Sequence, residues 1–240
     1  MAEGDSASVV AAIEDLHPTR IFHLATHFVG VHKPEDISAL VKGNVEFGTA
    51  VAEGASRSGA VLIYTASAWQ RFRGSQSSVS LYAALKESFS DVLTYYEEVE
   101  GTRVQQVFLF DTYGPSDMRG KLVSRLLRAA RDDLPVTLGS PGKLINLTHA
   151  DDVVSGLVLS ASSLPLRRDW VIRAQESVTL AELVDLVSTV SGRKLAVEWN
   201  PDLDRPREMF EEWRFGEVVP LTCRTSLVDG LDSLWTGQRK

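Results

Sequence analysis

The sequence predicts an α/β fold with a doubly wound parallel sheet. Short apolar segments alternate along the chain with longer segments of helical periodicity, which is typical of parallel strands joined by crossover helices. A polar residue closes three of the apolar segments, namely Thr26, Ser67 and Asp111. Because ligands bind at the carboxyl ends of the strands in such sheets, these three residues indicate the functional edge of the fold.

The first half of the chain contains three strands and three helices in alternation. Asp5 or Ser6 begins the first helix, and His17-Pro18 ends it. The next segments are a strand at 20–25, a polar loop at 26–35, a helix at 36–56, a β-rich buried strand at 61–64, a helix at 80–98 and a strand at 104–110.

Shorter elements fill the second half. Thr179 and Glu182 have the spacing of a capping box, which predicts a helix from there to about residue 190. The others are a basic helix at 121–131, a strand at 144–149, a helix at 151–162, a strand at 169–174, a small strand at 194–198, a proline-broken charged loop at 201–207 and a final helix at 225–235.

Composition limits the classes of function. A net charge of −7 argues against nucleic acid as the main partner, although a phosphorylated small molecule needs only a local cation or a helix N-terminus. The single cysteine, Cys223, excludes an intramolecular disulfide, and we expect no metal site. Apolar runs far shorter than a membrane span and acidic first residues lead us to expect a cytoplasmic protein without a membrane partner.

Tyr82 and Lys86 are candidate catalytic residues. They lie one helical turn apart, fifteen residues after the strand-end Ser67. A phenol with a pKa near ~10 becomes a useful acid–base group when a neighbouring cation favours the phenolate, and Ser67 is placed to hydrogen-bond the reacting oxygen. The alternative is a chance Tyr–Lys pair on a solvated helix face, and the position of Ser67 weighs against it.

Taken together, a set of motifs resembles the extended short-chain dehydrogenases/reductases, the NAD-dependent epimerase/dehydratase family. This resemblance implies an NAD(P)-binding Rossmann-like domain at 1–175 with a substrate-contributing insertion at about 114–146, and a small C-terminal substrate-binding portion at 176–240. It also implies NADP or NAD as cofactor and a nucleotide-sugar substrate. The motifs are His23-Leu24-Ala25, Asn44 with Gly48-Thr49, Thr65-Ala66-Ser67, Tyr82-x-x-x-Lys86, Tyr113-Gly114-Pro115 and Asp151-Asp152-Val153.

Within that family, segments 67–70, 81–86 and 110–121 look most like the CDP-4-keto-3,6-dideoxyhexose 4-reductases of the abequose-synthase type. The resemblance implies deoxysugar biosynthesis, with hydride passing from NAD(P)H to a CDP- or dTDP-4-keto-deoxyhexose and Tyr82 as proton donor. Two alternatives stay open. One is a nucleotide-sugar 4-epimerase, and the other is a non-catalytic remnant that binds a nucleotide sugar or a partner chain.

The resemblance also implies roles for single residues. Tyr82 is the expected catalytic acid, Lys86 lowers its pKa and holds the nicotinamide ribose, and Ser67 hydrogen-bonds the substrate. His149, Asp151 and Asp152 are expected to form a structural turn and helix cap. The expected cofactor-binding residues are Ala25, Thr26, Thr65, Tyr82, Lys86, Leu109 and Phe110, and the expected substrate-binding residues are Ser67, Asp111 and Lys121. For Lys121 a solvated basic helix is an equal alternative.

Three departures from the family pattern matter. Ala68-Trp69 stands where dehydratases carry an Asp-Glu pair, which argues against dehydration, and Ile145 replaces a phosphate-binding Arg of many epimerases. No glycine-rich phosphate-binding turn occurs near the start of the sequence. We therefore expect an N-terminally truncated sheet with strand 20–25 at its edge, and weak cofactor binding by the chain alone. Two explanations stay open: the chain is a fragment of a longer product, or it is a degenerate relative that pairs with a second chain, such as a homodimer partner.

Overall fold

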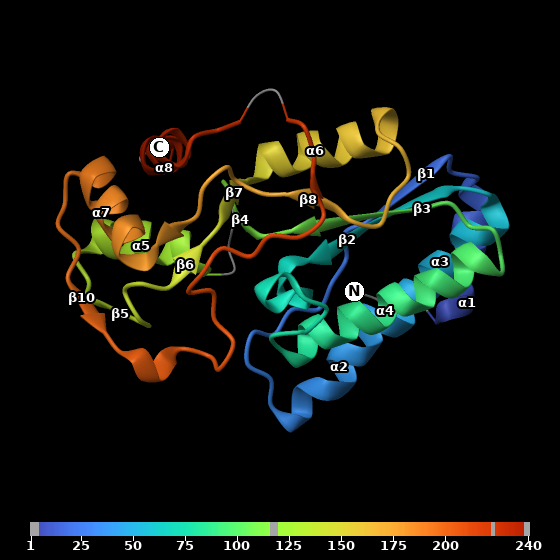
Figure 1. The fold of residues 1–240 in the computed structure, drawn as a ribbon, viewed down its shortest axis with the longest axis horizontal. Helices are drawn as coiled ribbons and strands as arrows, with labels where there is room; N and C mark the ends of the chain where they lie inside the picture. Colours follow the sequence, from blue (N-terminus) through green and yellow to red (C-terminus); the bar gives the residue numbers. More distant parts are fainter. Residues whose placement is uncertain (1–4, 116–119, 222–223, 238–240) are drawn as a thin grey trace. The chain divides into compact units, whose positions relative to one another are not determined.

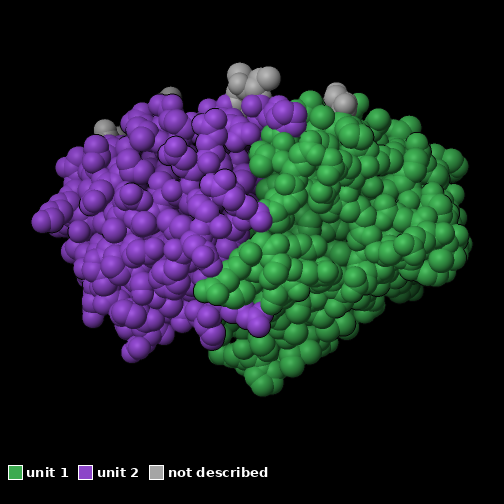
Figure 2. All heavy atoms as spheres, viewed as in Figure 1, with its two compact units in different colours: residues 1–109, 157–171, 215–219 green, residues 110–156, 172–214, 220–240 purple. Residues whose placement is uncertain are grey.

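The computed structural model of the chain describes residues 5–115, 120–221 and 224–237, so Cys223 lies outside the described residues. The chain divides into two compact units (Figure 2). Unit 1 comprises residues 1–109, 157–171 and 215–219, and unit 2 comprises residues 110–156, 172–214 and 220–240. Within the described residues, no helix is both long and apolar enough to span a membrane.

Unit 1 is built on a parallel sheet, as predicted. Within the described residues this sheet has five strands in the order β1-β2-β3-β8-β11. Every residue from Val61 to Ala66 is buried, because helices cover both faces of the sheet. The strands are β1 (Arg20–His23), β2 (Val61–Ser67), β3 (Val104–Leu109), β8 (Trp170–Ile172) and β11 (Glu217–Val218).

β1 forms one edge of the sheet, as expected for strand 20–25. It pairs in parallel with β2, with Arg20 opposite Val61 and His23 opposite Tyr64. The strand ends at His23, two residues earlier than predicted, so Leu24 and Ala25 already belong to the following loop. Phe22 and Leu24 are exposed beside this edge.

Helices cover the two faces of the unit 1 sheet (Figure 1). On one face α1 (Ser6–Leu16) packs on α3 (Phe47–Ser58), which lies beside α4 (Leu81–Glu98). Gly48 allows the close approach of α3 and α4, because a Cβ there would lie 2.9 Å from the Phe89 ring. On the other face lies the C-terminal part of α6 (Ala150–Ser163), where the Ser160 carbonyl accepts a hydrogen bond from Gln105.

The helix predicted at 36–56 is interrupted. Its structure is a short 3-10 turn η1 (Pro34–Asp36), α2 (Ile37–Val41), a π-helical turn η2 (Lys42–Glu46) and then α3. Asn44 lies buried inside the π-helical turn. Such turns occur mostly inside α-helices and frequently at functional sites.

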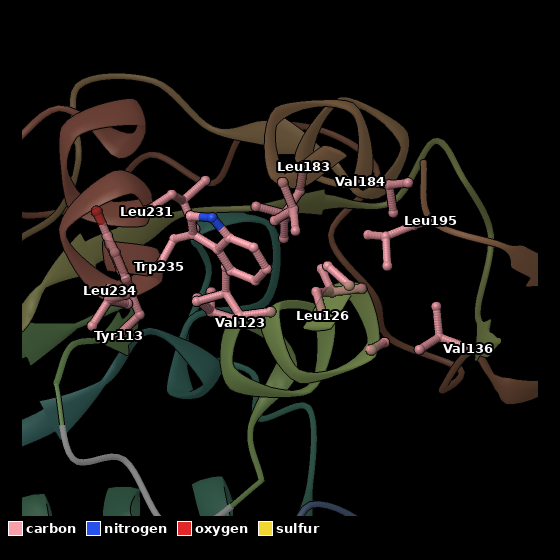
Figure 3. Packing of buried hydrophobic residues seen from close by; sticks show 14 of the residues in the cluster. Tyr113, Val123, Leu126, Val136, Leu183, Val184, Leu195, Leu231, Leu234 and Trp235 are labelled. Carbon is pink, nitrogen blue, oxygen red and sulfur yellow. The ribbon is translucent and has the colours of Figure 1, made fainter. Parts of the chain in front are cut away.

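Unit 2 has short strand pairs around a compact apolar core. β4 (Asp111–Tyr113) pairs with β7 (Leu147–His149), β5 (Val136–Leu138) with β10 (Val197–Trp199), and β6 (Leu144–Ile145) with β9 (Val178–Thr179). Helices α5 (Leu122–Asp132), α7 (Leu180–Ser191) and α8 (Leu227–Gly237) enclose the core, to which Leu126, Leu183 and Trp235 contribute (Figure 3).

Two predicted strands of this region are each split. The strand predicted at 104–110 becomes β3 and β4, and the strand predicted at 144–149 is interrupted at Asn146. The Asn146 side chain makes two hydrogen bonds with the Ala174 backbone. Its Oδ1 accepts from Ala174 N at 2.9 Å, and its Nδ2 donates to the Ala174 carbonyl at 3.2 Å. The predicted capping box is confirmed, because Glu182 N donates to Thr179 Oγ1 and Thr179 N donates to the Glu182 carboxylate.

Candidate active site

Ser67 occupies the carboxyl end of β2, where a 3-10 turn η3 (Ala68–Gln70) fixes it. Its Oγ accepts a hydrogen bond from Trp69 N at 3.3 Å, and its own N–H donates to Gln70 Oε1 at 2.8 Å. A hydroxyl that only accepts within the protein keeps its O–H free to donate. Ser67 is therefore a fixed, half-buried donor at the strand end.

Tyr82 and Lys86 lie in the first turns of α4, which begins after the N-cap Ser80. Both side chains are buried, with 7% and 3% of their surface exposed, so neither lies on a solvated helix face. Lys86 Nζ lies 5.8 Å from the centre of the Tyr82 ring and 4.7 Å from the centre of the Tyr64 ring. The helix therefore brings the phenol and the amine together, as the spacing predicts.

Burial shifts both pKa values in this pair. It lowers the pKa of Lys86 from 10.5 to about 7. It raises the pKa of the Tyr82 phenol above 10.0, and a hydrogen bond with the Thr26 side chain opposes that rise. The expected lowering of the Tyr82 pKa by Lys86 is not found, because desolvation of the phenol dominates and the lysine is only partly protonated at neutral pH.

A hydrogen-bonded loop after β1 reaches the same place. Thr26 Oγ1 donates to Asn44 Oδ1 at 2.6 Å, and Asn44 Nδ2 donates to the carbonyls of His27 at 2.8 Å and Leu40 at 2.9 Å. The Thr26 side chain also lies close enough to the Tyr82 phenol to oppose the rise of its pKa. The sequence marked Asn44 only as part of a motif. In the structure its buried amide holds the loop that contacts the phenol.

The other expected cofactor residues of unit 1 differ in their surroundings. Ala25 is exposed in the loop after β1, and Leu109 is half-buried at the end of β3. Thr65 is buried, and its hydroxyl donates to the His23 carbonyl at 3.2 Å. The Thr65 hydroxyl therefore ties β2 to β1, which leaves its oxygen only as an acceptor for a ligand.

In unit 2, Phe110 and Asp111 open the segment that leads into β4. The half-buried Phe110 ring lies 5.1 Å from the Arg173 guanidinium carbon. Burial raises the pKa of the Asp111 carboxyl, and the charges of Lys121, Arg205 and Lys143 act against that rise. Lys121, at the N-cap of α5, is thus close enough to Asp111 to act on it electrostatically.

A charged network beside Asp111 was missed by the sequence reasoning. Arg205 donates two hydrogen bonds of 2.9 Å to the Glu208 carboxylate. Lys143 Nζ lies 3.3 Å from Glu208 and 3.8 Å from Asp204. The alternating charges of residues 202–208 were the available signal, but their partner Lys143 is distant in sequence. The charged side chains of this loop are therefore ordered by ion pairs, and the loop does more than connect two elements.

Of the three residues expected to form a turn and helix cap, His149 bonds the first turn of α6, because Asp151 N donates to His149 Nδ1 at 3.3 Å. Asp152 lies inside α6 instead, and its carboxylate accepts from Thr225 N at 2.8 Å. These contacts connect β7, α6 and the segment before α8. Within the described residues, no group of three or more His, Cys, Asp or Glu side chains is placed to hold a metal ion.

Unit 2 also contains a cavity of about 340 Å³, which is within the lower range for small-ligand sites. Ile145, Thr148, Arg173 and Arg224 are among the residues that line it. Thr148 is 5% exposed, and its Oγ1 has no hydrogen-bond partner among the described residues. The cavity therefore combines basic groups with a buried hydroxyl that is able to bind a polar ligand.

Comparison with known proteins identifies a family and a shared fold. The model of the NAD dependent epimerase/dehydratase family matches residues 4–172. A search of curated proteins finds no match. MoeE5, solved in complex with UDP-glucuronic acid and NAD, is 20% identical; the alignment covers 99% of this chain and 85% of that one, with a TM-score of 0.80.

Two epimerase structures are similar to the same degree. The UDP-glucose 4-epimerase of Thermus thermophilus, in complex with NAD, is 19% identical over 98% of this chain and 82% of its own, with a TM-score of 0.81. The UDP-glucuronic acid 4-epimerase of Bacillus cereus, in complex with UDP-glucuronic acid and NAD, is 17% identical over 99% and 81%, with a TM-score of 0.82. These structural similarities show a common Rossmann-like α/β fold with a parallel central sheet.

Proposed function

The chain belongs to the NAD dependent epimerase/dehydratase family, and on this basis we propose that it is a nucleotide-sugar 4-keto reductase. Hydride passes from NAD(P)H to C4 of a CDP- or dTDP-4-keto-deoxyhexose, and Tyr82 gives the proton. One observation carries the proposal: the Ser67 hydroxyl closes β2, while Tyr82 and Lys86 are buried one turn apart at the start of α4.

In this proposal each of the three side chains has a distinct role. Ser67, held by its contacts with Trp69 and Gln70, donates its O–H to the sugar C4 oxygen. Tyr82 keeps its proton at neutral pH because burial raises its pKa, which suits a group that must give a proton to the forming alkoxide. Lys86 would hold the ribose hydroxyls of the cofactor, and hydrogen bonds to those hydroxyls would favour its protonated form, which burial disfavours.

The residues present fit part of the cofactor. When bound, NAD(P)H supplies the hydride. Lys86 and Tyr82 would hold its ribose, the Ala25–Thr26 loop and Thr65 would line its path, and the chain near Leu109 and Phe110 would approach the nicotinamide. The sequence contains no glycine-rich turn of the kind that cradles the pyrophosphate. The chain therefore fits the nicotinamide end of the cofactor and does not itself account for the adenosine end.

Unit 2 offers groups for the nucleotide sugar. Asp111 and Lys121 act on each other electrostatically and would contact the sugar or its phosphates. Arg173, Arg224 and Ile145 line the unit 2 cavity, and the family resemblance implies that many epimerases carry a phosphate-binding Arg at the position of Ile145. We therefore assign phosphate contacts to these two arginines, because a guanidinium matches the geometry of phosphate oxygens.

The test begins with binding and then measures turnover. The chain is titrated with NADH and NADPH, and a 4-keto-6-deoxy nucleotide sugar is then added while the reduced nicotinamide absorbance is followed. We expect one reduced cofactor to be consumed for each 4-keto sugar reduced. Binding of neither cofactor, in the presence or absence of the sugar nucleotide, contradicts the proposal and favours a non-catalytic remnant.

A 4-epimerase is the second candidate, because several solved structures of similar fold are UDP-sugar 4-epimerases. An epimerase regenerates its oxidised cofactor in every turnover and so needs no added reductant. Interconversion of a UDP-sugar and its C4 epimer without NADH or NADPH, together with no net reduction of a 4-keto sugar, would favour this second activity over the first.

A further inference from the structure

Gln70 connects Ser67 to the helix that carries Tyr82 and Lys86. Its side chain is fully buried, with 0% exposed. Gln70 Oε1 accepts from Ser67 N at 2.8 Å, and Gln70 Nε2 donates to Glu87 Oε2 at 2.6 Å and to Ser90 Oγ at 3.4 Å. One buried amide thus joins the strand end to α4.

The partners fix which way the amide points. Ser67 offers an N–H and therefore needs an oxygen, while the Glu87 carboxylate needs a donor, so the two ends of the Gln70 amide cannot exchange places. Glu87 is itself held by Arg71 at 2.7 Å and by Gln76 at 2.6 Å. The anchor on α4 is consequently a charged and well-ordered group.

A capping role alone does not explain this residue. Ser67 and Gln70 form a capping box around η3, but that turn has only three residues. The contacts of Gln70 with Glu87 and Ser90 reach 17 and 20 residues along the chain, to a different element. Glu87 directly follows Lys86, and Ser90 Oγ donates to the Lys86 carbonyl at 3.2 Å.

We propose that Gln70 is a positioning residue that sets the Ser67 hydroxyl relative to Tyr82 and Lys86. The inference rests on the proposed function and assigns Gln70 no contact with substrate. If the Gln70 amide loses its donor, Ser67 and α4 lose their direct connection. The proton donor and the oxygen-binding hydroxyl then no longer meet the same substrate atom, so turnover suffers more than binding.

Gln70→Glu is the informative variant. It keeps an acceptor for Ser67 N but places a second carboxyl against Glu87. Two such carboxyls share a proton at low pH and repel at high pH. We expect kcat to fall about tenfold at pH 8 with KM for the nucleotide sugar changed less than about twofold, and to recover partly as the pH is lowered to about 6.

Gln76→Glu is the matched control, because it also places a carboxyl against Glu87, but at an exposed position where water screens the repulsion, and Gln76 does not contact Ser67. We expect it to keep the kcat and pH profile of the parent. The double variant Q70E/E87Q exchanges donor and acceptor and should restore most of kcat at pH 8. Equal pH profiles for Q70E and Q76E, or no rescue by the double variant, would overturn the proposal.

A second measurement separates this inference from the proposed function. In Gln70→Leu the Ser67 amide loses its acceptor, so its hydrogen exchange should accelerate at least about tenfold. In Gln76→Leu it should not change. This readout needs no substrate and serves even if the chain reduces no 4-keto sugar. An unchanged Ser67 exchange rate in Q70L would contradict the positioning role.

Discussion

Lys86 Nζ lies 4.7 Å from the centre of the Tyr64 ring, so the amine of α4 rests on a buried aromatic face of β2. The ring provides some compensation for a cation, but it does not replace the water that burial removes. The result is a lysine whose pKa falls to about 7. A buried lysine of this kind destabilises the folded chain. It can still serve a binding site whose ligand favours the charged amine.

Lys86→Met should therefore stabilise the chain while removing the proposed activity. The folded pKa of about 7 lies below the unfolded value of 10.5, so the unfolded state binds the extra proton between these values. Stability must rise as the pH rises from 7 to 10.5, and the full penalty applies below pH 7. At pH 7 this pKa shift lowers the free energy of unfolding by on the order of 4 kcal/mol, as an upper limit.

Urea unfolding at several pH values from 6 to 9 measures this effect. The K86M variant should be more stable than the parent at pH 7, with the difference shrinking toward pH 10. Lys42→Met, at an exposed position, serves as control and should leave stability and its pH dependence unchanged. A less stable K86M at pH 7 would show that the lysine is not a strained buried cation.

His23 makes the chain sensitive to acid. Burial, followed by the charge of Lys86, lowers its pKa from 6.5 to about 4. Its ring stacks on Tyr64 at 5.7 Å and meets the Phe89 ring edge-on at 5.7 Å. Because the folded pKa is depressed, the unfolded state takes up the proton first, and stability is lost as the pH falls from 6.5 to 4.

His23→Phe should remove that loss, which amounts to about 3 kcal/mol at pH 4. Phenylalanine fits the aromatic surroundings and carries no titratable group. Thermal unfolding between pH 4 and 7 gives the measurement, and His32→Asn, at an exposed position, is the control. If the parent and H23F lose stability in parallel over this range, His23 is not the group responsible.

The core of the site was predictable because its signals are local. The helical periodicity of segment 80–98 indicates α4, which then places Tyr82 and Lys86 one turn apart. Thr179 and Glu182 form their predicted box for the same reason. The Gln70 contact was also within reach, because Ser67-x-x-Gln70 has the spacing of a capping box, although nothing local indicates its second bond to Glu87.

Features that depend on distant partners were not predictable. Asn44 lies in a π-helical turn and its amide binds the Thr26–His27 loop, and neither the turn nor that contact leaves a periodic signal. The predicted strand at 144–149 breaks because Asn146 binds the Ala174 backbone. The raised pKa of Tyr82 likewise reflects packing rather than the adjacent lysine that the spacing emphasised.

Tyr82→Phe should abolish reduction in an active form of the protein and leave binding of the nucleotide sugar nearly intact. The substitution removes the phenolic O–H and keeps the ring, which meets the Phe28 ring edge-on at 5.0 Å. Rates with NADPH and calorimetric binding of the nucleotide sugar provide the comparison. A Y82F protein with parental kcat would rule out the proposed proton donor.

Ser67→Ala should slow turnover by about 10²-fold, as expected when one donor to a developing oxyanion is lost. The same measurement of rates with NADPH tests this expectation.

Asn44→Ala should destabilise the chain more than Thr26→Val does, although both remove the bond between the two side chains. Asn44 is buried, and its loss also removes the hydrogen bonds that its amide donates to the His27 and Leu40 carbonyls. Unpaired buried groups cost about 1–3 kcal/mol, so we expect N44A to lose about 2–4 kcal/mol in urea unfolding and T26V less than about 1 kcal/mol.

Both variants should lower kcat, because both release the loop from Tyr82. Equal stability losses would mean that Asn44 acts only through Thr26, and an N44A protein with parental stability and kcat would show that the π-helical turn holds the loop without its amide.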